Sequence, residues 1–389
     1  MTELAAVKAA LKSQAVETPS WAYGNSGTRF KVFTQPGVPR DPREKLDDAA
    51  KVHEFTGAAP SVALHIPWDM VDGSDGYAGL AKYAEERGLR LGTINSNTFQ
   101  DDDYRLGSIC HPHASVRRKA VDHLLHCVDI MDATGSRDLK LWFADGTNYP
   151  GQDDIRGRQD RLAEGLAEVY ARLGEDQRML LEYKLFEPAF YTMDVPDWGT
   201  AYAHCLKLGP RARVVVDTGH HAPGTNIEFI VATLLREGKL GGFDFNSRFY
   251  ADDDLMAGAA DPFQLFRIMY EVIRGGGFTP EVAFMLDQCH NIEAKIPAII
   301  RSVMNVQEAT AKALLVDRAA LAEAQRSGDV LAANAVVMDA YNTDVRPLLA
   351  EVRRELGLDS DPVAAYHRSG WAARIAEERV GGQQAGWGA

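Results

Sequence analysis

The 389-residue chain has few cysteines and no long apolar run. Its four cysteines show neither a CxxC pair nor regular spacing, which argues against a disulfide framework and predicts reduced thiols in a cytosolic protein. No apolar stretch approaches the roughly 20 residues that span a bilayer, and residues 1–17 lack the continuous apolar core of a signal peptide. We therefore expect a cytoplasmic protein with no membrane partner. The cysteines are Cys110, Cys127, Cys205 and Cys289.

Positive charge is also scarce, because 42 Lys and Arg face 55 Asp and Glu, for a formal net charge of -13. This balance repels a phosphate backbone, and the sequence contains no basic patch, so nucleic-acid binding is excluded. The remaining composition, 46% hydrophobic and 25% charged, is ordinary for a globular protein that can bury a sizeable core. A bound metal cation would offset part of the negative charge.

Apolar strand-like segments alternate with helix-like segments along most of the chain. Residues 227–235 have apolar side chains at helical spacing after Asn226 as a cap, and Asp261-Pro262 opens a second such helix. Buried strands separated by helices imply parallel pairing, so eight units predict an α/β fold, a (β/α)₈ TIM barrel, with a doubly wound sheet as the alternative. The strand candidates are 28–33, 61–66, 89–94, 139–144 and the segments that begin at residues 179, 214, 241 and 283.

After residue 305 the pattern becomes helical only. We predict an N-terminal helix over 1–20, the barrel with its metal site over 21–305, and a C-terminal α-helical extension over 306–389. The extension is predicted to contact a second subunit in a homo-oligomer. The alternative is that these helices cover their own barrel.

Four consecutive strand candidates end on carboxylates, namely Glu182, Asp217, Asp244 and Asp287. A carboxylate directly after a buried strand is costly unless something compensates its charge, and divalent cations do so well. In a barrel the carboxyl ends of many strands converge on one axis, whereas a doubly wound sheet gathers its site at one switch point. Four adjacent ligand-bearing strands therefore favour the barrel.

Further metal ligands follow two of these strands. His220 comes after Gly219, which allows a sharp turn, and Asp252 and Asp254 have a D-x-D spacing. Taken alone, His220 would be a surface histidine and the acidic segment a solvated loop. Together with the four carboxylates they make seven candidate ligands, which favours two ions that share a carboxylate. Histidine and carboxylate ligands together suit Mn²⁺, Co²⁺ or Zn²⁺.

Other residues at the strand ends suggest a sugar site. Lys184 lies two residues after Glu182 and so points to the same face, as a structural ion pair or a catalytic pair. His65 and Trp142 end the second and fourth strand candidates, and Trp68 follows His65 closely. Aromatic faces beside polar groups bind sugar rings and polyols, although barrel core is the alternative for the tryptophans.

The chain resembles L-rhamnose isomerases of the bacterial type with broad sugar specificity, which are related to xylose isomerases. The resemblance covers residues 21–295, and the combination of motifs is specific although each one alone is weak. The motifs are HIPWD, LWFADGTNYPGQ, EYKLFEPAFY, VDTGHHAPGTN, FNSRFYADDDL and MLDQCHN.

The resemblance implies an aldose–ketose isomerase that interconverts L-rhamnose and L-rhamnulose, with two divalent ions and a homotetrameric assembly. Mn²⁺ is the expected ion, with Co²⁺, Mg²⁺ or Zn²⁺ as alternatives. The matched positions imply a structural ion on Glu182, Asp217, Asp244 and Asp287, a catalytic ion on His220, Asp252 and Asp254 with Glu182 shared, and substrate contacts from His65, Trp68, Trp142 and Lys184. Several relatives carry histidine where this chain has Asp244, which makes the site more anionic.

We hypothesise that hydrogen moves between C1 and C2 of an open-chain sugar, as a hydride or as a proton through an enediol. Lys184 would stabilise charge on O1, and a water oriented by Asp287 or Asp254 would move the proton between O1 and O2. Three alternatives are a sugar epimerase, which needs a second well-placed glutamate besides Glu182, a metal-dependent hydrolase, and a non-catalytic sugar-binding protein. Lys184 argues against the last, because a metal clip needs no ammonium group.

Overall fold

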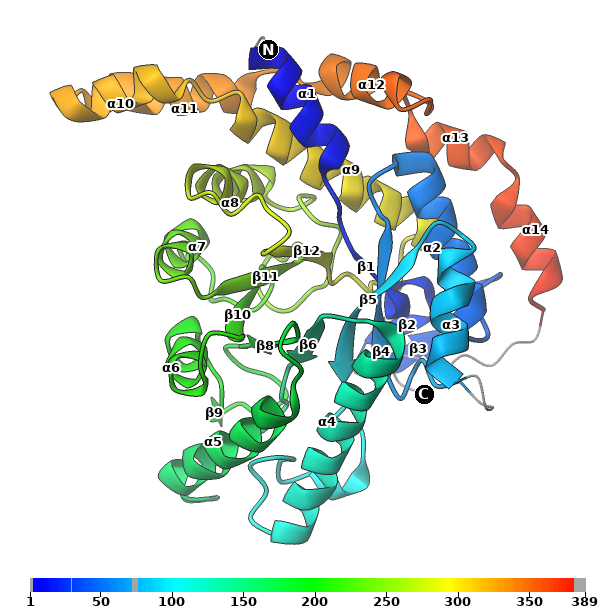
Figure 1. Cartoon of the computed structure of the whole chain (residues 1–389), viewed down its shortest axis with the longest axis vertical. Helices are drawn as coiled ribbons and strands as arrows, with labels where there is room; N and C mark the ends of the chain where they lie inside the picture. The colour runs from blue at the N-terminus through cyan, green and yellow to red at the C-terminus, as the bar shows by residue number, and fades with distance from the viewer. Residues whose placement is uncertain (1–2, 29, 72–75, 381–389) are drawn as a thin grey trace.

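The computed structural model describes residues 3–28, 30–71 and 76–380 of the chain. Eight parallel strands form one sheet, in the order in which they occur along the chain. The sheet closes through residue 17, because Glu17 N donates to Phe284 O at 2.8 Å and Leu286 N donates to Glu17 O at 3.0 Å. The predicted TIM barrel is confirmed (Figure 1). Its strands are β1 (Thr18–Pro19), β4 (Ser61–Ile66), β5 (Arg90–Ser96), β6 (Asp138–Leu141), β8 (Arg178–Glu182), β10 (Ala212–Asp217), β11 (Leu240–Phe245) and β12 (Ala283–Leu286).

The first barrel strand is not the one predicted. The segment 28–33, of which residue 29 lies outside the described residues, contributes to an antiparallel hairpin of β2 (Ser26–Thr28) and β3 (Lys31–Phe33) outside the barrel. Its apolar side chains are not fully buried, and Phe33 is 41% exposed. The true first strand has two residues and ends on proline, so neither length nor composition marks it as a strand. It exists because Thr18 and Pro19 pair with Val62 and Ala63 of β4.

Helices follow the strands and cover the outside of the barrel (Figure 1). The two predicted caps are present, because Asn226 Oδ1 accepts from Phe229 N and Asp261 Oδ1 accepts from Gln264 N, both at 2.8 Å. Such caps satisfy amide groups that have no partner within the helix. The outer helices are α2 (Pro42–Thr56), α3 (Gly76–Glu85), α4 (Ala114–Thr134), α5 (Ile155–Arg172), α6 (Trp198–Leu208), α7 (Ile227–Arg236), α8 (Pro262–Arg274) and α9 (Lys295–Leu314).

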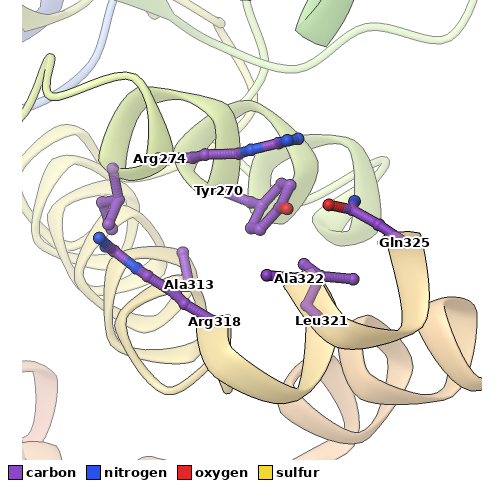
Figure 2. A pocket seen from close by; sticks show the side chains of 8 residues that line it. Tyr270, Arg274, Ala313, Arg318, Leu321, Ala322 and Gln325 are labelled. Carbon is purple, nitrogen blue, oxygen red and sulfur yellow. The ribbon is translucent and has the colours of Figure 1, made fainter. Parts of the chain in front are cut away.

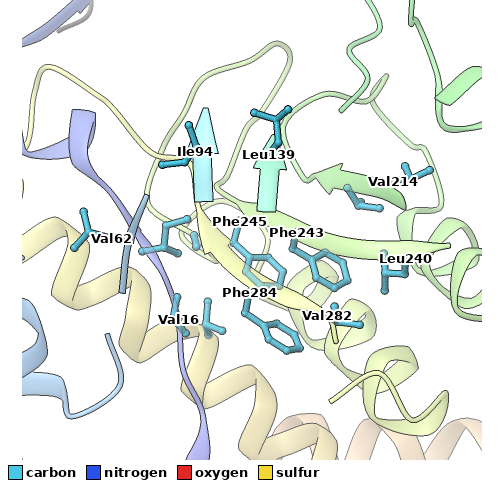
Figure 3. Packing of buried hydrophobic residues seen from close by; sticks show 14 of the residues in the cluster. Val16, Val62, Ile94, Leu139, Val214, Leu240, Phe243, Phe245, Val282 and Phe284 are labelled. Atoms are coloured by element: carbon cyan, nitrogen blue, oxygen red, sulfur yellow. The ribbon is translucent and has the colours of Figure 1, made fainter. Parts of the chain in front are cut away.

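The pleat of the strands separates two kinds of side chain. Phe243 and Phe245 of β11 stack with ring centroids 4.8 Å apart, and Phe284 of β12 packs on both of them in the main hydrophobic core (Figure 3). Asp244 lies between the two phenylalanines and therefore points to the opposite, inner face. The same alternation places Lys140 on the inner face of β6, between two leucines of the main core. Polar groups thus gather on the barrel axis.

The C-terminal extension is helical, and it is interrupted at Gly328, which has φ 73°. A second interruption falls at Gly370, which has φ 71°. Figure 1 shows α10 and α11 extending away from the barrel, whereas α13 and α14 run beside it. The extension helices are α10 (Arg318–Ser327), α11 (Val330–Asn342), α12 (Arg346–Glu355), α13 (Pro362–Arg368) and α14 (Trp371–Glu378), and residues 381–389 lie outside the described part.

The base of α10 packs against α8, with a groove of about 160 Å³ between them. Figure 2 shows Tyr270 and Arg274 of α8 across this groove from Leu321 and Gln325 of α10. Beyond this contact α11 is mostly exposed, and Ala340 is its one buried residue.

Several small elements complete the described chain. They are α1 (Glu3–Ser13), the 3-10 turns η1 (Ser20–Tyr23) and η2 (Asp102–Tyr104), and the short strands β7 (Gly146–Thr147) and β9 (Thr192–Met193). All four cysteines are buried and unpaired. Within the described ranges, no helix has the length and apolarity that a membrane span requires.

Candidate metal centre and active site

Four carboxylates lie together at the carboxyl ends of β8, β10, β11 and β12. Glu182, Asp217 and Asp244 are buried and Asp287 is half-buried, and each offers an oxygen within 4.8 Å of the others. Neighbouring groups fix two of them: Asn246 Nδ2 donates to Asp217 Oδ1 at 3.0 Å, and the indole N–H of Trp21 donates to Asp287 Oδ1 at 2.9 Å. We refer to Glu182, Asp217, Asp244 and Asp287 as the carboxylate tetrad.

His220 lies beside the tetrad with its two ring nitrogens in different surroundings. Nδ1 is 3.0 Å from the carbonyl oxygen of Tyr183 and 3.1 Å from Glu182 Oε1, so we assign a proton to Nδ1. Nε2 is 3.3 Å from Asp252 Oδ1 and 4.0 Å from Asp217 Oδ2. A backbone carbonyl on one ring nitrogen is the usual support of a histidine that binds metal through the other. The geometry therefore directs Nε2 as a ligand toward two carboxylates.

Gly219 provides the space in front of these ligands. A Cβ atom at this position would lie 2.8 Å from Asn246 Oδ1, 3.0 Å from Asp252 Oδ1 and 3.1 Å from Asp217 Oδ1. Since real Cβ atoms do not approach this closely without movement of a neighbour, a larger residue would push the carboxylates apart. The glycine predicted from the sequence as a turn residue thus also leaves room among the carboxylates.

The loop after β11 brings Asp252 and Asp254 back over the strand ends. Ser247 and Leu255 exchange backbone hydrogen bonds of 2.9 and 3.0 Å, which close the loop. Asp252 Oδ1 is 3.3 Å from His220 Nε2, and Asp254 has a φ of 47°. Neither aspartate belongs to the groups of described residues whose ligand atoms all lie within 4.8 Å of one another. Burial and the charge of Asp252 raise the pKa of Asp254 well above its usual value. Without an ion, Asp254 can therefore hold a proton, and its role as a ligand of the catalytic ion stays a prediction.

Lys184 lies between the candidate metal ligands and the aromatic side chains. Its Nζ is 2.7 Å from Asp252 Oδ2 and 5.3 Å from the ring centroid of Trp142. Burial lowers the pKa of Lys184, but the charge and hydrogen bond of Asp252 outweigh burial and raise it above the usual value. Lys184 therefore stays an ammonium group at neutral pH and can stabilise negative charge but not act as a base.

The aromatic residues predicted to contact substrate form one cluster. His65 stacks on Trp68 with centroids 3.7 Å apart, Phe99 lies 5.8 Å from His65, and Trp142 lies 5.0 Å from Phe99. Burial and the charge of Lys140 lower the pKa of His65 well below its usual value, so it is neutral. In the described structure His65 Nδ1 and Trp142 Nε1 are buried without a hydrogen-bond partner. Such atoms are available to bind a polar ligand.

Lys140 is the site residue that we did not predict. Its Nζ forms an ion pair with Asp244 Oδ2 and lies 3.8 Å from Glu182 Oε2, and the side chain is 5% exposed. Burial alone would lower its pKa, but Asp244, Glu182 and Asp287 outweigh burial and raise it. A lysine between two leucines on a buried strand is the signal that strand alternation could have detected. Trp21, which binds Asp287, carried no comparable signal.

The cluster has more negative than positive charge, and its pKa values reflect this. Burial, together with neighbouring carboxylates, raises the pKa of Asp217 to about 7 and those of Asp244 and Asp287 above their usual range. For Asp252 the burial effect is outweighed by His220 and Lys184, which lower the pKa. A bound divalent cation would lower the raised pKa values of Asp217, Asp244 and Asp287, since carboxylates bind metal in the ionised form.

The chemistry of the ligands decides where an ion fits. Glu182, Asp217 and His220 offer atoms within 4.8 Å of one another, and Asp252 Oδ1, which has no hydrogen-bond partner in the described structure, is 3.3 Å from His220 Nε2. These residues fit one divalent ion that accepts nitrogen and oxygen ligands. The tetrad differs, because the ammonium group of Lys140 already contacts two of its four carboxylates.

Comparisons with known proteins agree with the barrel fold. Residues 48–291 match the family described as a xylose isomerase-like TIM barrel. A probable sugar isomerase of Rhizobium meliloti (strain 1021) is 45% identical over 387 residues, which cover 97% of this chain and 89% of the relative. A probable sugar isomerase of Mesorhizobium japonicum is 44% identical over 384 residues, which cover 96% and 88% of the two chains.

Solved structures are similar in fold only. L-ribulose 3-epimerase superposes with a TM-score of 0.53 at 14% identity, over 84% of this chain and 97% of the other. The IolI protein with a bound zinc atom gives a TM-score of 0.52 at 13% identity, over 77% and 98%. At these identities the superpositions support the barrel and do not distinguish isomerisation from epimerisation.

Proposed function

Because the chain belongs to the xylose isomerase-like TIM barrel family, we propose that it is a metal-dependent aldose–ketose isomerase that converts L-rhamnose and related aldoses into ketoses. The observation that carries the proposal is the position of Lys184. Its ammonium group contacts a metal ligand, Asp252, and faces the ring of Trp142. A cation between metal ligands and an aromatic wall suits a reaction in which charge develops on a sugar oxygen.

The substrate would lie along the aromatic cluster in its open-chain form. Trp142 and Trp68 provide flat apolar surfaces, and the unpaired Nδ1 of His65 and Nε1 of Trp142 provide polar atoms for hydroxyl groups. Neutral His65 can accept as well as donate a hydrogen bond, which suits a hydroxyl group. The polyol is thus oriented with its C1–C2 end toward Lys184.

The reaction moves the hydrogen of C2 to C1 and the proton of O2 to O1, so the aldehyde becomes a hydroxymethyl group and C2 becomes a ketone. The bound ion supplies Lewis-acid polarisation of the sugar oxygens. Lys184 stabilises the charge that develops on O1. Asp254, whose pKa is raised, can hold and return the proton that passes between O2 and O1, and Asp287 is the second candidate for this role.

The ion itself is proposed to be Mn²⁺, with Co²⁺, Mg²⁺ and Zn²⁺ as alternatives. One imidazole and three carboxylates are ligands that all except Mg²⁺ accept readily. Glu182, Asp217, His220 and Asp252 would hold it.

A substrate panel tests the function. The full chain is treated with a chelator, desalted and assayed for ketose formation from L-rhamnose and other aldoses, with and without added Mn²⁺. We expect ketose formation only with the ion. Failure of added Mn²⁺, Co²⁺, Mg²⁺ or Zn²⁺ to restore ketose formation from any aldose would contradict the proposal, and conversion of ketoses to their 3-epimers would indicate an epimerase.

We also propose a homo-oligomer, a tetramer by the family resemblance, in which α11 contacts a second subunit. The helix has one charged residue, Asp339, while Val330 and Leu331 are 76% and 83% exposed. An exposed apolar helix of this kind is typical of a subunit interface. Replacing both residues with lysine should reduce the mass of the assembly measured by light scattering. The double substitution of Ala372 and Ala373 with lysine on α14 is the matched control and should leave the mass unchanged.

A further inference from the structure

The tetrad contains a positively charged group supplied by the chain itself. Lys140 Nζ is paired with Asp244 Oδ2, lies 3.8 Å from Glu182 Oε2 and lies 5.5 Å from the ring centroid of Trp21. The ring adds a favourable cation–π contact to the ammonium group, and the indole N–H of the same tryptophan donates to Asp287 Oδ1. Lys140 is therefore a built part of the site and not a mobile surface side chain.

The fold holds Lys140 in this position. Leu139 and Leu141 on either side belong to the main core and are fully buried, so β6 cannot rotate to move the lysine outward. Lys140 pairs in register with Leu180 of β8, two residues before Glu182. The chain thus fixes an ammonium group next to a carboxylate from the adjacent strand β8 and one from β11, which is not adjacent to β6.

The second group of ligands is arranged differently. Lys184 contacts Asp252 through Oδ2, whereas Asp252 Oδ1 makes no hydrogen bond in the described structure and lies 3.3 Å from His220 Nε2. This lysine therefore leaves the oxygen that faces the histidine available to an ion. Lys140 likewise contacts Asp244 through Oδ2 and leaves Oδ1 without a hydrogen bond in the described structure, but it also lies 3.8 Å from Glu182 Oε2, a second tetrad carboxylate. An ion added beside these two carboxylates would experience repulsion from the charge of Lys140 at short range.

We infer that Lys140 is the internal cation of the tetrad and that the chain consequently binds one divalent ion, on Glu182, Asp217, His220 and Asp252, in place of the two that the resemblance implies. The inference deepens the proposed function, since it concerns the metal content of the same site. Its test counts ions and needs no turnover, so it can fail while the isomerase proposal stands, and the reverse also holds.

The experiment measures the Mn²⁺ content of the full chain. Metal-free protein is saturated with Mn²⁺, desalted and analysed by elemental mass spectrometry, and its electron paramagnetic resonance spectrum is recorded. We expect one Mn²⁺ per chain and the spectrum of an isolated ion. Two ions per chain, or the spectrum of a coupled pair, would overturn the inference.

Lys140→Met tests the cause, because it removes the charge and keeps much of the side-chain volume. We expect the Mn²⁺ content to rise from one to two per chain and a coupled spectrum to appear. One ion in both proteins would overturn the role of Lys140. A Lys140→Met protein that folds only with Mn²⁺ present, while the wild type stays folded after chelation, would independently support Lys140 as the internal cation. If Lys140→Met does not fold at all, the Mn²⁺ count and the spectrum of the wild type test the inference.

A double variant provides the matched control. Lys140→Met with Asp244→Asn removes the ammonium group together with its partner, so the tetrad loses both charges. We expect this protein to fold without metal and to bind one ion. Two ions in the double variant would mean that Asp244 is not needed for the second ion, which contradicts the pairing proposed here.

Discussion

Lys184→Met is expected to lower kcat by about 10²- to 10³-fold, the range found when one preorganised donor to a developing oxyanion is removed. KM should change little, because the interaction strengthens mainly in the transition state. The physical reason is that Lys184 Nζ is a buried cation, 2.7 Å from Asp252, at the boundary between metal ligands and Trp142. Steady-state kinetics on the Mn²⁺-loaded protein with the preferred aldose measures the effect.

Two controls show whether a lower kcat in Lys184→Met comes from loss of the ammonium group at the substrate. Lys207→Met removes an exposed lysine on α6 and should leave kcat unchanged. The Mn²⁺ content of Lys184→Met should equal that of the wild type, because the metal ligands remain. A fall in activity that only matches a loss of Mn²⁺ would show that Lys184 acts through Asp252 and not on the substrate.

His220→Ala is expected to have the second large effect, by removing the nitrogen ligand of the ion. We expect loss of bound Mn²⁺ and a fall in kcat/KM of about 10³-fold or more, since Lewis-acid stabilisation contributes several kcal/mol. The imidazole Nε2 faces Asp217 and Asp252, while Nδ1 is fixed by Tyr183 O, so no other nitrogen can replace it. Titration calorimetry with Mn²⁺ and the aldose assay measure the two effects.

The adjacent histidine is the matched control for His220. His221 Nε2 lies 2.6 Å from the hydroxyl group of Tyr183, and His221 belongs to neither ligand group. His221→Gln should retain Mn²⁺ binding, although loss of the buried contact can lower the stability by about 1 kcal/mol. Wild-type Mn²⁺ affinity in His220→Ala would contradict the assignment of the ion.

Strand periodicity and strand ends were enough to predict the barrel and to bring most of the candidate ligands together. Glu182, Asp217, Asp244 and Asp287 each follow an apolar run, and the parallel fold brings the ends of those runs to one axis. The first strand escaped prediction because Thr18–Pro19 is too short to show a period and depends on pairing with β4. The local sequence pattern identifies strands and helices that are long enough to show their own periodicity. It does not identify a short strand that forms only through its tertiary contacts.

Lys140 shows a different limit of sequence reasoning. Its alternation with two leucines predicts an inward side chain, but its partners come from β8 and β11, more than 40 residues away. Which carboxylate it would meet depends on strand register, and register is set by the closed barrel. Asp254 shows the same limit, because the left-handed turn at φ 47° decides where its side chain goes.

Carbon-13 spectroscopy of a labelled aldose tests the central claim most directly. The Mn²⁺-loaded chain is incubated with L-rhamnose labelled at C1, or with the aldose that the panel identifies. We predict that the labelled anomeric carbon becomes a hydroxymethyl carbon. With chelated protein or with Lys184→Met, we expect the signal of the anomeric carbon to stay unchanged over the same time. A labelled carbon that remains anomeric while a new epimer accumulates, or that does not change at any metal loading, would contradict an aldose–ketose isomerase.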